Sequence, residues 1–388
     1  MIKELAGKYK EYVINLRNEL HMNPGLSWEE YGASEIIKRE LKSMGLPYKE
    51  MAKTGVVVDI KGNQEGKCVL LRADMDALPV TECTTVAYKS KVEGVMHACG
   101  HDGHVAQLLG AVKILNECRD MIKGTVRCIF QPAEEIGQGA DKMIEEGVLE
   151  GIDGAFAIHL WSGIPVGKIS AEPGPRMASA DNFQIKIIGK GGHGSLPQQC
   201  VDPVVTASAF VMNLQSIVSR ETNPNESLVI TVGKIHTGTT ANVIPGYAVI
   251  EGTARCFNTE LRKEIPKMIE RILKGTTDIY RAEYEMDYKF YPAPVINDAE
   301  CAKLARETAA KLYGEDSLYS LEKLTTAEDF SAYSTRVPSV LAFVGVRNEK
   351  KECVYPHHHA KFNMDEDGFE VSTALYAQYA VDFLNVEK

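Results

Sequence analysis

Residues 68–79 read CVLLRADMDALP, an apolar run that ends in charged residues. Two later stretches have the same form, CIFQPAEE at 128–135 and GAFAIHLW at 154–161. Each apolar run has the length of a strand, and helical patterns lie between the runs. Strands that alternate with helices favour an α/β fold with a largely parallel sheet. Because binding sites gather where the strands of such sheets end, the polar ends of these runs are candidate site residues.

The spacing of apolar residues predicts the helices and strands around these runs. We expect a helix over 4–21, broken by NPGLS, and a second helix that ends near Met44. Ser27 and Glu30 have the form of a capping box at the start of this second helix. Further helices are expected at about 103–118, 139–147, 299–313 and 367–385, and further strands at 55–61 and 339–346.

The pattern changes at AEPGPRMASADN, residues 171–182. A strand, a helix, two strands, a helix and a strand then follow, in the order of the ferredoxin-like split fold. These elements are expected at 183–189, 202–219, 227–236, 246–257, 260–279 and 281–291. The stretch YPAPVIND closes the segment, and the α/β pattern resumes after it. We therefore predict that residues 181–292 form a domain inserted into a first domain, which consists of 1–180 and 293–388.

The composition is that of a globular chain and argues against two classes of partner. The 388 residues are 44% hydrophobic and 25% charged, with a net charge of −10. An acidic chain repels nucleic acid and anionic membrane surfaces, and the apolar runs are too short to cross a bilayer. The first residues lack the apolar core of a signal peptide, and the nine cysteines include no CxxC pair. We expect a cytoplasmic protein with reduced, mostly buried thiols.

The stretch MHACGHDGHVA, residues 96–106, holds three of the ten histidines of the chain. Cys99 and His101 lie two residues apart between glycines, and thiolate and imidazole are the ligands that zinc-like ions prefer. Taken alone, the pair could equally be a buried thiol beside a chance histidine. The other polar residues of the stretch are expected to support the ligands or the fold: His97, Asp102 and His104.

Three other segments offer ligands of the same kinds. Glu134 and Glu135 follow a strand, and adjacent carboxylates point in different directions, so one can bind metal while the other acts as a base. His159 ends another strand, and residues 357–359 are a run of three histidines. Two carboxylates at the end of the first strand could orient a ligand histidine: Asp74 and Asp76. A set of cysteine, histidine and one carboxylate suits Zn, Mn, Co or Ni better than Mg or Ca.

Seven stretches together resemble the M20 metallopeptidase family, over nearly the whole chain and in the order of the family. They are LRADMDALP, MHACGHDGH, QPAEE, IHLW, GKGGHGSLPQQCVDP, TTANVIPGYAVIEGTAR and HHHAKFNMDE. The similarity is greatest to the amidohydrolase branch, which includes aminoacylase-like, hippurate and indoleacetyl-amino-acid hydrolases. The resemblance implies a phosphorylase/hydrolase-like α/β catalytic domain with a mixed sheet. It also implies two divalent metal ions and an inserted ferredoxin-like α+β lid domain that often dimerises.

The resemblance assigns roles to residues of this chain by motif. The implied metal ligands are Cys99, His101, Glu135, His159 and His358, with Cys99 bridging. The tandem histidines leave the last ligand open between His358 and His359. Glu134 would be the general base, and His193 the donor to the oxyanion, delivered by the lid or by a partner subunit.

The same resemblance implies that Asn242 and Arg255 bind the carboxylate of the substrate. Two positions depart from the pattern of the wider family. Asp74 stands in place of its first ligand histidine, a replacement typical of this branch. Arg176 stands where an apolar residue is expected, so it contacts either the substrate or the hinge.

The implied reaction is hydrolysis of the amide bond of an N-acyl-amino acid, to a carboxylate and a free amino acid. A peptidase of the same family is the first alternative, and a non-catalytic binding protein is the second. The glycines of GKGGHG also spell a dinucleotide fingerprint, but Pro197 and Pro203 stand where its helix would begin. No GxSxG elbow is present for a serine nucleophile. We expect a small-molecule substrate and a homodimer, or a higher homo-oligomer, formed through the lid.

Overall fold

The computed structural model describes residues 1–386, which form two compact units. Unit 1 comprises residues 1–176, residues 296–322 and the described residues from Asp329 onward. Unit 2 comprises residues 177–295 and 323–328. None of the helices within residues 1–386 is long and apolar enough to cross a lipid bilayer.

Unit 1 is built on a seven-stranded mixed sheet in the order β1-β2-β4-β3-β5-β15-β6. Its strands are Tyr48–Met51 (β1), Gly55–Lys61 (β2), Gln64–Asp74 (β3), Lys123–Gln131 (β4), Gly154–Pro165 (β5), Ile169–Ser170 (β6) and Ser339–Arg347 (β15). The largely parallel sheet that we expected is present only in the middle, where β4, β3, β5 and β15 run parallel. β1, β2 and β6 join antiparallel. The connection from β1 to β2 is short, so these two strands can pair only as a hairpin.

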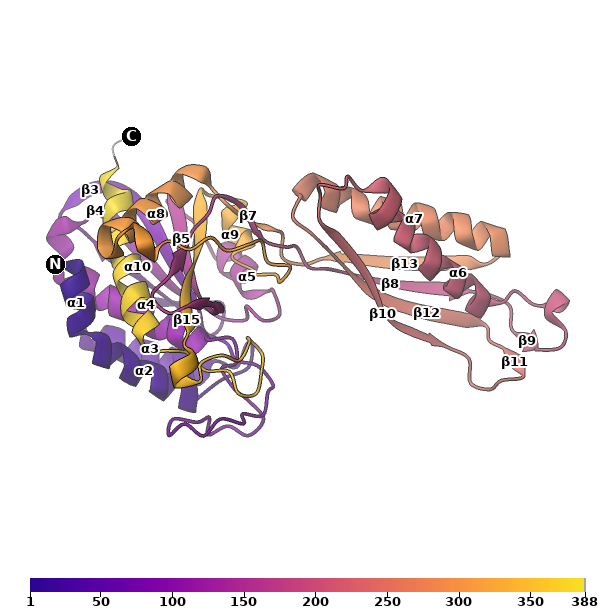
Figure 1. Ribbon diagram of the computed structural model, residues 1–388, viewed down its shortest axis with the longest axis horizontal. Coiled ribbons are helices and arrows are strands. Elements are labelled where there is room, and N and C mark those ends of the chain that lie inside the picture. Colours follow the sequence, from indigo (N-terminus) through magenta and orange to yellow (C-terminus); the bar gives the residue numbers. More distant parts are fainter. Residues whose placement is uncertain (387–388) are drawn as a thin grey trace. The chain divides into compact units, whose positions relative to one another are not determined.

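One of the helices of unit 1 begins inside the core of the unit. The helices are Ile2–Lys8 (α1), Lys10–Met22 (α2), Tyr31–Ser43 (α3), His101–Glu117 (α4), Gly139–Glu145 (α5), Ala299–Tyr313 (α8), Ser331–Ser334 (α9) and Asp367–Asn385 (α10). α4 and α10 pack against each other and against β3 and β5 (Figure 1). Both are buried along most of their length, as helices that are apolar on every side must be. The first turn of α4 therefore lies inside unit 1, close to the strand ends.

Two expectations for the N-terminal helices are wrong. The helix expected over 4–21 is interrupted at Tyr9, between α1 and α2. The capping box of Ser27 and Glu30 does not form: Glu30 precedes α3 without a side-chain cap, and Ser27 donates to Asp76 instead. Both side chains bond buried groups, where an unpaired donor is more costly than at a solvated helix end. The other helices and strands expected for unit 1 are confirmed to within a few residues.

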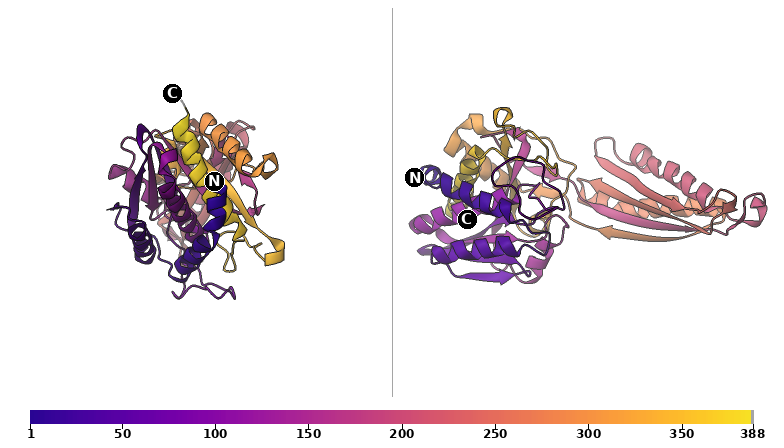
Figure 2. Two further views of the ribbon diagram at one scale, coloured as in Figure 1. Left: turned by 90° about the vertical axis from the view of Figure 1, so that its left-hand side faces the viewer. Right: turned by 90° about the horizontal axis from the view of Figure 1, so that it is seen from below.

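Unit 2 has a four-stranded antiparallel sheet in the order β10-β12-β8-β13. Its elements are Asp181–Ile188 (β8), Gly192–His193 (β9), Pro203–Ser216 (α6), Leu228–Thr237 (β10), Val243–Ile244 (β11), Tyr247–Cys256 (β12), Thr259–Tyr280 (α7) and Glu283–Phe290 (β13). The long elements follow the expected β-α-β-β-α-β order. Figure 2 shows both helices on one face of this sheet, so the other face is left uncovered.

The remaining elements are short. Gly174–Met177 (β7) and Val295–Asn297 (β14) pair with each other where the chain connects the two units. The single turns are Arg119–Met121 (η1), Pro197–Gln199 (η2), Ile217–Glu221 (η3), Glu315–Ser317 (η4) and Glu349–Lys351 (η5). Seven of the nine cysteines are buried, as we expected for most of them.

Candidate functional site

Four segments of unit 1 bring metal-ligating side chains to one place. Cys99 precedes α4 and His101 begins it, Glu135 follows β4, His159 lies in β5, and His358 lies in the loop after β15. The ligand atoms of Cys99, His101 and His159 lie within 4.8 Å of one another. So do the ligand atoms of Cys99, Glu135 and His358. The structure thus gathers all five residues that the sequence singled out as ligands.

The ring of His101 is held so that one nitrogen faces the carboxylates. Its Nδ1 donates to Asp76 Oδ1 at 3.2 Å, which leaves Nε2 as the atom that points to the cluster. Nε2 is buried without a hydrogen-bond partner, 3.8 Å from Glu135 Oε1, which is also buried without one. Two buried polar atoms left unpaired face to face are costly in a folded protein. A bound cation would satisfy both, because a carboxylate oxygen and an imidazole nitrogen each bind zinc at about 2.0–2.2 Å.

The charges of the cluster also favour a cation. Burial opposes the charge of His101, but the carboxylates of Asp74 and Asp76 outweigh it and raise the pKa of His101 to about 10. Burial raises the pKa of Glu135 to about 7. Both shifts show that the carboxylates around His101 need positive charge among them, which a proton or a metal ion can supply.

The imidazole ring of His159 is also fixed by a hydrogen bond of its Nδ1. Its Nδ1 donates to the carbonyl oxygen of Leu160 at 2.8 Å, so Nε2 keeps its lone pair. That Nε2 lies 3.7 Å from Cys99 Sγ. Burial holds the pKa of His159 well below its usual value, so the imidazole is neutral. A neutral imidazole with its other nitrogen fixed by a carbonyl is the form that binds metal.

His104, in contrast, has both ring nitrogens occupied. The main-chain N–H of Leu160 donates to Nε2 at 2.9 Å, so the proton of the ring is on Nδ1. Nδ1 donates to Asp74 Oδ1 at 2.5 Å, and Arg72 donates to the other oxygen of Asp74. His104 and Asp74 are therefore engaged in supporting contacts, which agrees with the role expected for them.

The structure separates the three histidines of the run at 357–359. His357 is half-buried, accepts from the main chain of Ser162 at 3.3 Å and packs against Trp161. His359 is exposed and stacks on Tyr355. Only His358, whose φ of 65° turns it away from its neighbours, faces the cluster, with Nε2 3.6 Å from Glu135 Oε2. Of the two alternatives left open, the geometry favours His358 over His359.

The remaining polar residues of the histidine-rich stretch face the interior. Asp102 accepts from Arg17 Nε at 2.9 Å and from His21 Nδ1 at 2.7 Å, and all three side chains are buried. His97 is also buried, and burial lowers its pKa to about 4. The contacts of Asp102 hold the first turn of α4 to α2, which agrees with the supporting role expected for Asp102. Both ring nitrogens of His97 are buried without a hydrogen-bond partner among residues 1–386.

Glu134 has a neighbour that the sequence analysis missed. The main-chain N–H of Asp329 donates to Glu134 Oε1 at 3.4 Å, while Glu134 Oε2 lies 4.0 Å from His101 Nε2. The carboxylate of Asp329 accepts from Arg72 at 2.7 Å and from Gln131 at 2.8 Å. The signal was present in two places: an acidic pair in the loop TTAEDF, and an arginine inside the apolar strand β3.

The three site residues predicted in unit 2 do not all lie together. His193 in β9 pairs with Val243 in β11, and Asn242 accepts from the main chain of Gly194 at 2.9 Å, so His193 and Asn242 are close. Both are exposed. Arg255 lies near the other end of β12, eight residues or about 27 Å along the strand from Tyr247. Within unit 2, the proposed carboxylate binders thus lie at opposite ends of the sheet.

Arg176 in β7 is 6% exposed and belongs to the connecting segments. Its guanidinium donates to the carbonyl oxygen of Leu321 and lies 3.6 Å from Glu172. Burial lowers the pKa of Arg176. Of the two contacts expected for it, substrate or hinge, these partners favour the hinge.

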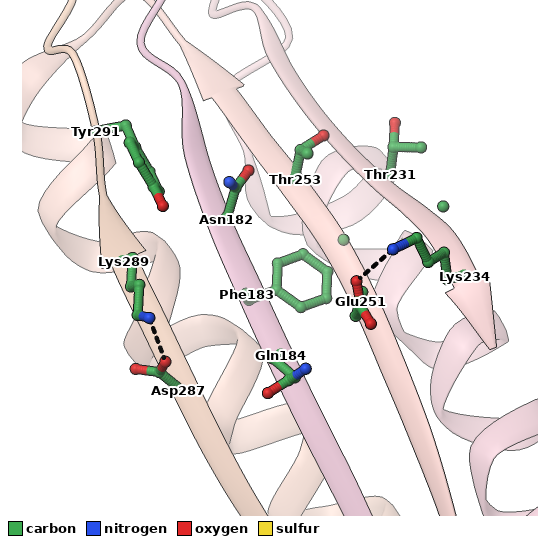
Figure 3. A pocket seen from close by; sticks show the side chains of 12 residues that line it. Asn182, Phe183, Gln184, Thr231, Lys234, Glu251, Thr253, Asp287, Lys289 and Tyr291 are labelled. Carbon is green, nitrogen blue, oxygen red and sulfur yellow. Dashed lines mark hydrogen bonds and ion pairs between the residues drawn. The ribbon is translucent and has the colours of Figure 1, made fainter. Parts of the chain in front are cut away.

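Unit 2 also has a hollow on the uncovered face of its sheet, of about 400 Å³ (Figure 3). Its charged side chains pair with each other: Lys234 with Glu251 at 2.9 Å, and Lys289 with Asp287 at 3.3 Å. Amides and hydroxyls complete the lining: Asn182, Gln184, Thr231, Thr253 and Tyr291. None of the predicted site residues lines this hollow.

Comparison with known proteins places this geometry in context. Residues 70–382 match the family described as Peptidase family M20/M25/M40. Thermostable carboxypeptidase 2 of Saccharolobus solfataricus is 40% identical over 394 residues, which cover 99% of this chain and 99% of the relative. N-acetylcysteine deacetylase of Bacillus subtilis is 39% identical over 378 residues, which cover 97% of this chain and 98% of the relative.

A solved structure supports the same relationship. The YXEP protein of Bacillus subtilis, described as a dinuclear metal-binding peptidase of the M20 family, has a TM-score of 0.87 to this chain at 36% identity. The match covers 97% of this chain and 99% of that one. Sequence and fold are therefore shared along nearly the whole length.

Proposed function

This chain belongs to the peptidase family M20/M25/M40, as its motifs led us to expect, and on that premise we propose that it hydrolyses N-acyl-amino acids. It is an enzyme, a metal-dependent amidohydrolase that splits the amide bond into a carboxylate and a free amino acid. The relative named N-acetylcysteine deacetylase acts on a substrate of this class. The acyl group and the amino acid that this chain prefers are the first unknowns to measure.

One observation supports the proposal most strongly. The unpaired Nε2 of His101 and the unpaired Oε1 of Glu135 face each other in a buried cluster of carboxylates. We propose that this cluster holds two divalent ions, with Cys99, His101, Glu135, His159 and His358 as ligands. A thiolate among nitrogen and oxygen ligands favours Zn, Mn, Co or Ni over Mg and Ca.

Each residue around the cluster then has its own proposed role in hydrolysis. When bound, the metal ions lower the pKa of water toward neutrality and polarise the amide carbonyl. Glu134 takes the proton of the attacking water and returns it to the leaving amine. The N–H of Asp329 bonds Glu134 Oε1, and Oε2 lies 4.0 Å from Nε2 of the proposed ligand His101. Asp76 and the carbonyl of Leu160 keep His101 and His159 in the tautomers that can bind metal.

Unit 2 is proposed to act as the lid and to form a homodimer. His193 would donate to the oxyanion, and Asn242 and Arg255 would bind the carboxylate of the substrate. His193 and Asn242 lie at the end of the sheet opposite to Arg255. This separation fits an arrangement in which one subunit supplies His193 and Asn242 and the other supplies Arg255. β10 is an edge strand, and it and α6 expose apolar side chains that suit an interface: Val205, Met212, Val229 and Ile235.

A peptidase of the same family is the second candidate. It is favoured by the similarity to thermostable carboxypeptidase 2 of Saccharolobus solfataricus. The two functions differ in what precedes the cleaved bond, because a peptidase accepts a free α-amino group there. The buried cysteines are compatible with reduced thiols, and we propose a cytoplasmic location.

The test begins with the metal content of protein purified without chelator. The same protein is then assayed on N-acyl-amino acids and on matched dipeptides, with and without added Zn, Mn, Co or Ni. We expect one to two ions per chain, activity that chelator removes and metal restores, and a preference for the acylated substrates. A preference for dipeptides would favour the peptidase, and inactivity with every metal would refute both.

A further inference from the structure

Glu30 is a buried carboxylate that stands outside the metal cluster, and its contacts differ from those of a helix cap. The residue is fully buried and accepts three hydrogen bonds. Its Oε1 accepts from the main-chain N–H of Trp28 at 2.8 Å and of Ala133 at 2.9 Å. Its Oε2 accepts from the hydroxyl of Thr54 at 2.6 Å. The carboxylate thus ties the segment before α3 to the loop after β4.

The two main-chain donors share an unusual conformation. Trp28 has a φ of 68° and Ala133 a φ of 54°, both in the left-handed region. Residues with a Cβ adopt this region rarely, and they persist there only when the surrounding structure holds them. One carboxylate oxygen, Glu30 Oε1, bonds the N–H of both residues. Glu30 is therefore the group placed to hold both strained peptides.

Ala133 immediately precedes Glu134, the proposed base, and Glu135, a proposed metal ligand. A change of its φ would swing the next peptides and move the carboxylates of Glu134 and Glu135. The far side of this pair is held by Asp76, whose Oδ2 accepts from the main-chain N–H of Glu135 at 3.0 Å. The loop is therefore braced by one buried carboxylate on each side of Glu134.

Ser27 connects the two braces. It donates to Asp76 Oδ2 at 2.7 Å, and it lies three residues before Glu30. Of the two residues that looked like a capping box in the sequence, Glu30 is thus one of the carboxylates that hold the loop, and Ser27 bonds the other, Asp76. Their spacing serves the loop after β4, and α3 begins without a side-chain cap.

We infer that Glu30 is a positioning residue: by holding Ala133 in the left-handed conformation, it aims Glu134 and Glu135 at the metal cluster. The inference rests on the roles proposed above for these two glutamates. Glu30 touches neither the substrate nor the metal. Its effect passes through the Oε1 contact to Ala133, whereas the Oε2 contact to Thr54 only anchors the carboxylate.

Four variants separate positioning from mere stability. Glu30→Ala removes both contacts, and Glu30→Gln keeps an oxygen for the two N–H groups while its amide can donate to Thr54. Thr54→Val removes only the contact to Oε2. Glu29→Ala is the matched control, because Glu29 is the exposed neighbour. Each variant is first checked for folding by circular dichroism and thermal unfolding.

Three quantities are measured on the folded variants. They are the affinity of the metal-free protein for Mn²⁺, kcat and KM on an N-acetyl-amino acid, and hydrogen exchange of the peptide that contains Ala133. For Glu30→Ala we expect kcat to fall about 100-fold with KM nearly unchanged, since a displacement of about 1 Å has that effect. We expect Mn²⁺ affinity to fall about 10-fold or more, and exchange at Ala133 to become faster.

The conservative variant decides between hydrogen bonding and burial. Glu30→Gln should restore slow exchange, Mn²⁺ affinity and most of kcat, and Thr54→Val and Glu29→Ala should stay close to the parent protein. The inference is overturned if folded Glu30→Ala keeps kcat and slow exchange, or if Thr54→Val is as damaging as Glu30→Ala. If no substrate is turned over but Mn²⁺ affinity and exchange respond as expected, the positioning stands and the proposed function fails.

Discussion

The metal-ligating cluster of unit 1 and the hollow on the sheet of unit 2 are both polar, but their polar atoms are in opposite states. In the cluster, His101 and Glu135 present buried atoms that no neighbour satisfies. In the hollow, lysines and acids are exposed to solvent and pair with each other. The charged groups of the hollow thus satisfy each other, whereas a cation would satisfy the unpaired buried atoms of the cluster. An unpaired imidazole nitrogen and an unpaired carboxylate oxygen that face each other therefore indicate a site better than the volume of the hollow does.

The largest effect is expected from Glu134→Gln, which removes the proposed base. The amide keeps the size of the side chain and an oxygen for the N–H of Asp329, so the loop stays in place. We expect kcat to fall about 1000-fold while the metal content is unchanged, because general-base catalysis contributes about 10²- to 10⁴-fold. Elemental analysis and steady-state kinetics measure both. The paired variant Glu135→Gln should lose metal, and the reverse pattern would exchange the two roles.

Removal of metal should destabilise unit 1 and leave unit 2 unchanged. A ligand present at 100 times its Kd stabilises the folded state by about 2.7 kcal/mol. We therefore expect chelator to lower the free energy of unfolding of unit 1 by about that amount, as followed by calorimetry and by hydrogen exchange of each unit. An equal shift in both units would mean that the ions bind elsewhere as well.

The next effect is expected from Asp76→Asn, which weakens the contact that orients His101. Asp76 also holds Ser27 and the main chain of Glu135, so its loss loosens the cluster without removing a ligand. Changes of this kind weaken metal binding about 10- to 100-fold. Titration of the metal-free protein with Mn²⁺ gives the affinity. Asp59→Asn, at a paired carboxylate elsewhere in unit 1, should leave the affinity unchanged.

The smallest effect is expected from Lys234→Met in the hollow of unit 2. Lys234 and Glu251 form an exposed pair, and such pairs stabilise proteins by only about 0–1 kcal/mol. We expect kcat, KM and Mn²⁺ affinity to match those of the parent protein. A clear rise in KM would show that the hollow takes part in substrate binding, and the contrast between the two regions would be lost.

The comparison also shows what the sequence could predict. The apolar spacing placed α8, α10 and the strands of unit 2 almost residue by residue. The central strands of unit 2 alternate between buried and more exposed positions and α8 has one buried face, whereas α10 is a long, mostly apolar segment.

The five proposed ligands followed from the resemblance to the family. Residue type alone marked the segments that hold them, but it left open which of Glu134 and Glu135, and which histidine of 357–359, would bind metal. The alternation of strands and helices predicted a largely parallel sheet, since the order of strands depends on contacts between distant segments, and only the family resemblance implied the mixed sheet that unit 1 has.

Residues that act through hydrogen bonds were harder to find. Glu30 fitted a local pattern well, but two of its three partners lie 24 and 103 residues away along the chain. Asp329 was not predicted, because the sequence of an acidic loop does not indicate that one of its carboxylates will accept from Arg72 and Gln131. Among the three histidines at 357–359, the backbone conformation decides which ring faces Glu135. That conformation could not be predicted from three identical residues in a row.

The discontinuity of unit 1 has a consequence for the order of synthesis. Unit 2 is almost entirely one continuous segment, so it can fold while the ribosome is still translating the C-terminal part of unit 1. Unit 1 cannot, because α10 fills its centre and Tyr376 bonds the main chain of both β3 and β5. Its N-terminal part must wait, with an apolar face exposed, for a helix made more than 200 residues after β3. We expect chaperone dependence during this interval and metal loading only after it, because the proposed ligand His358 is also made late.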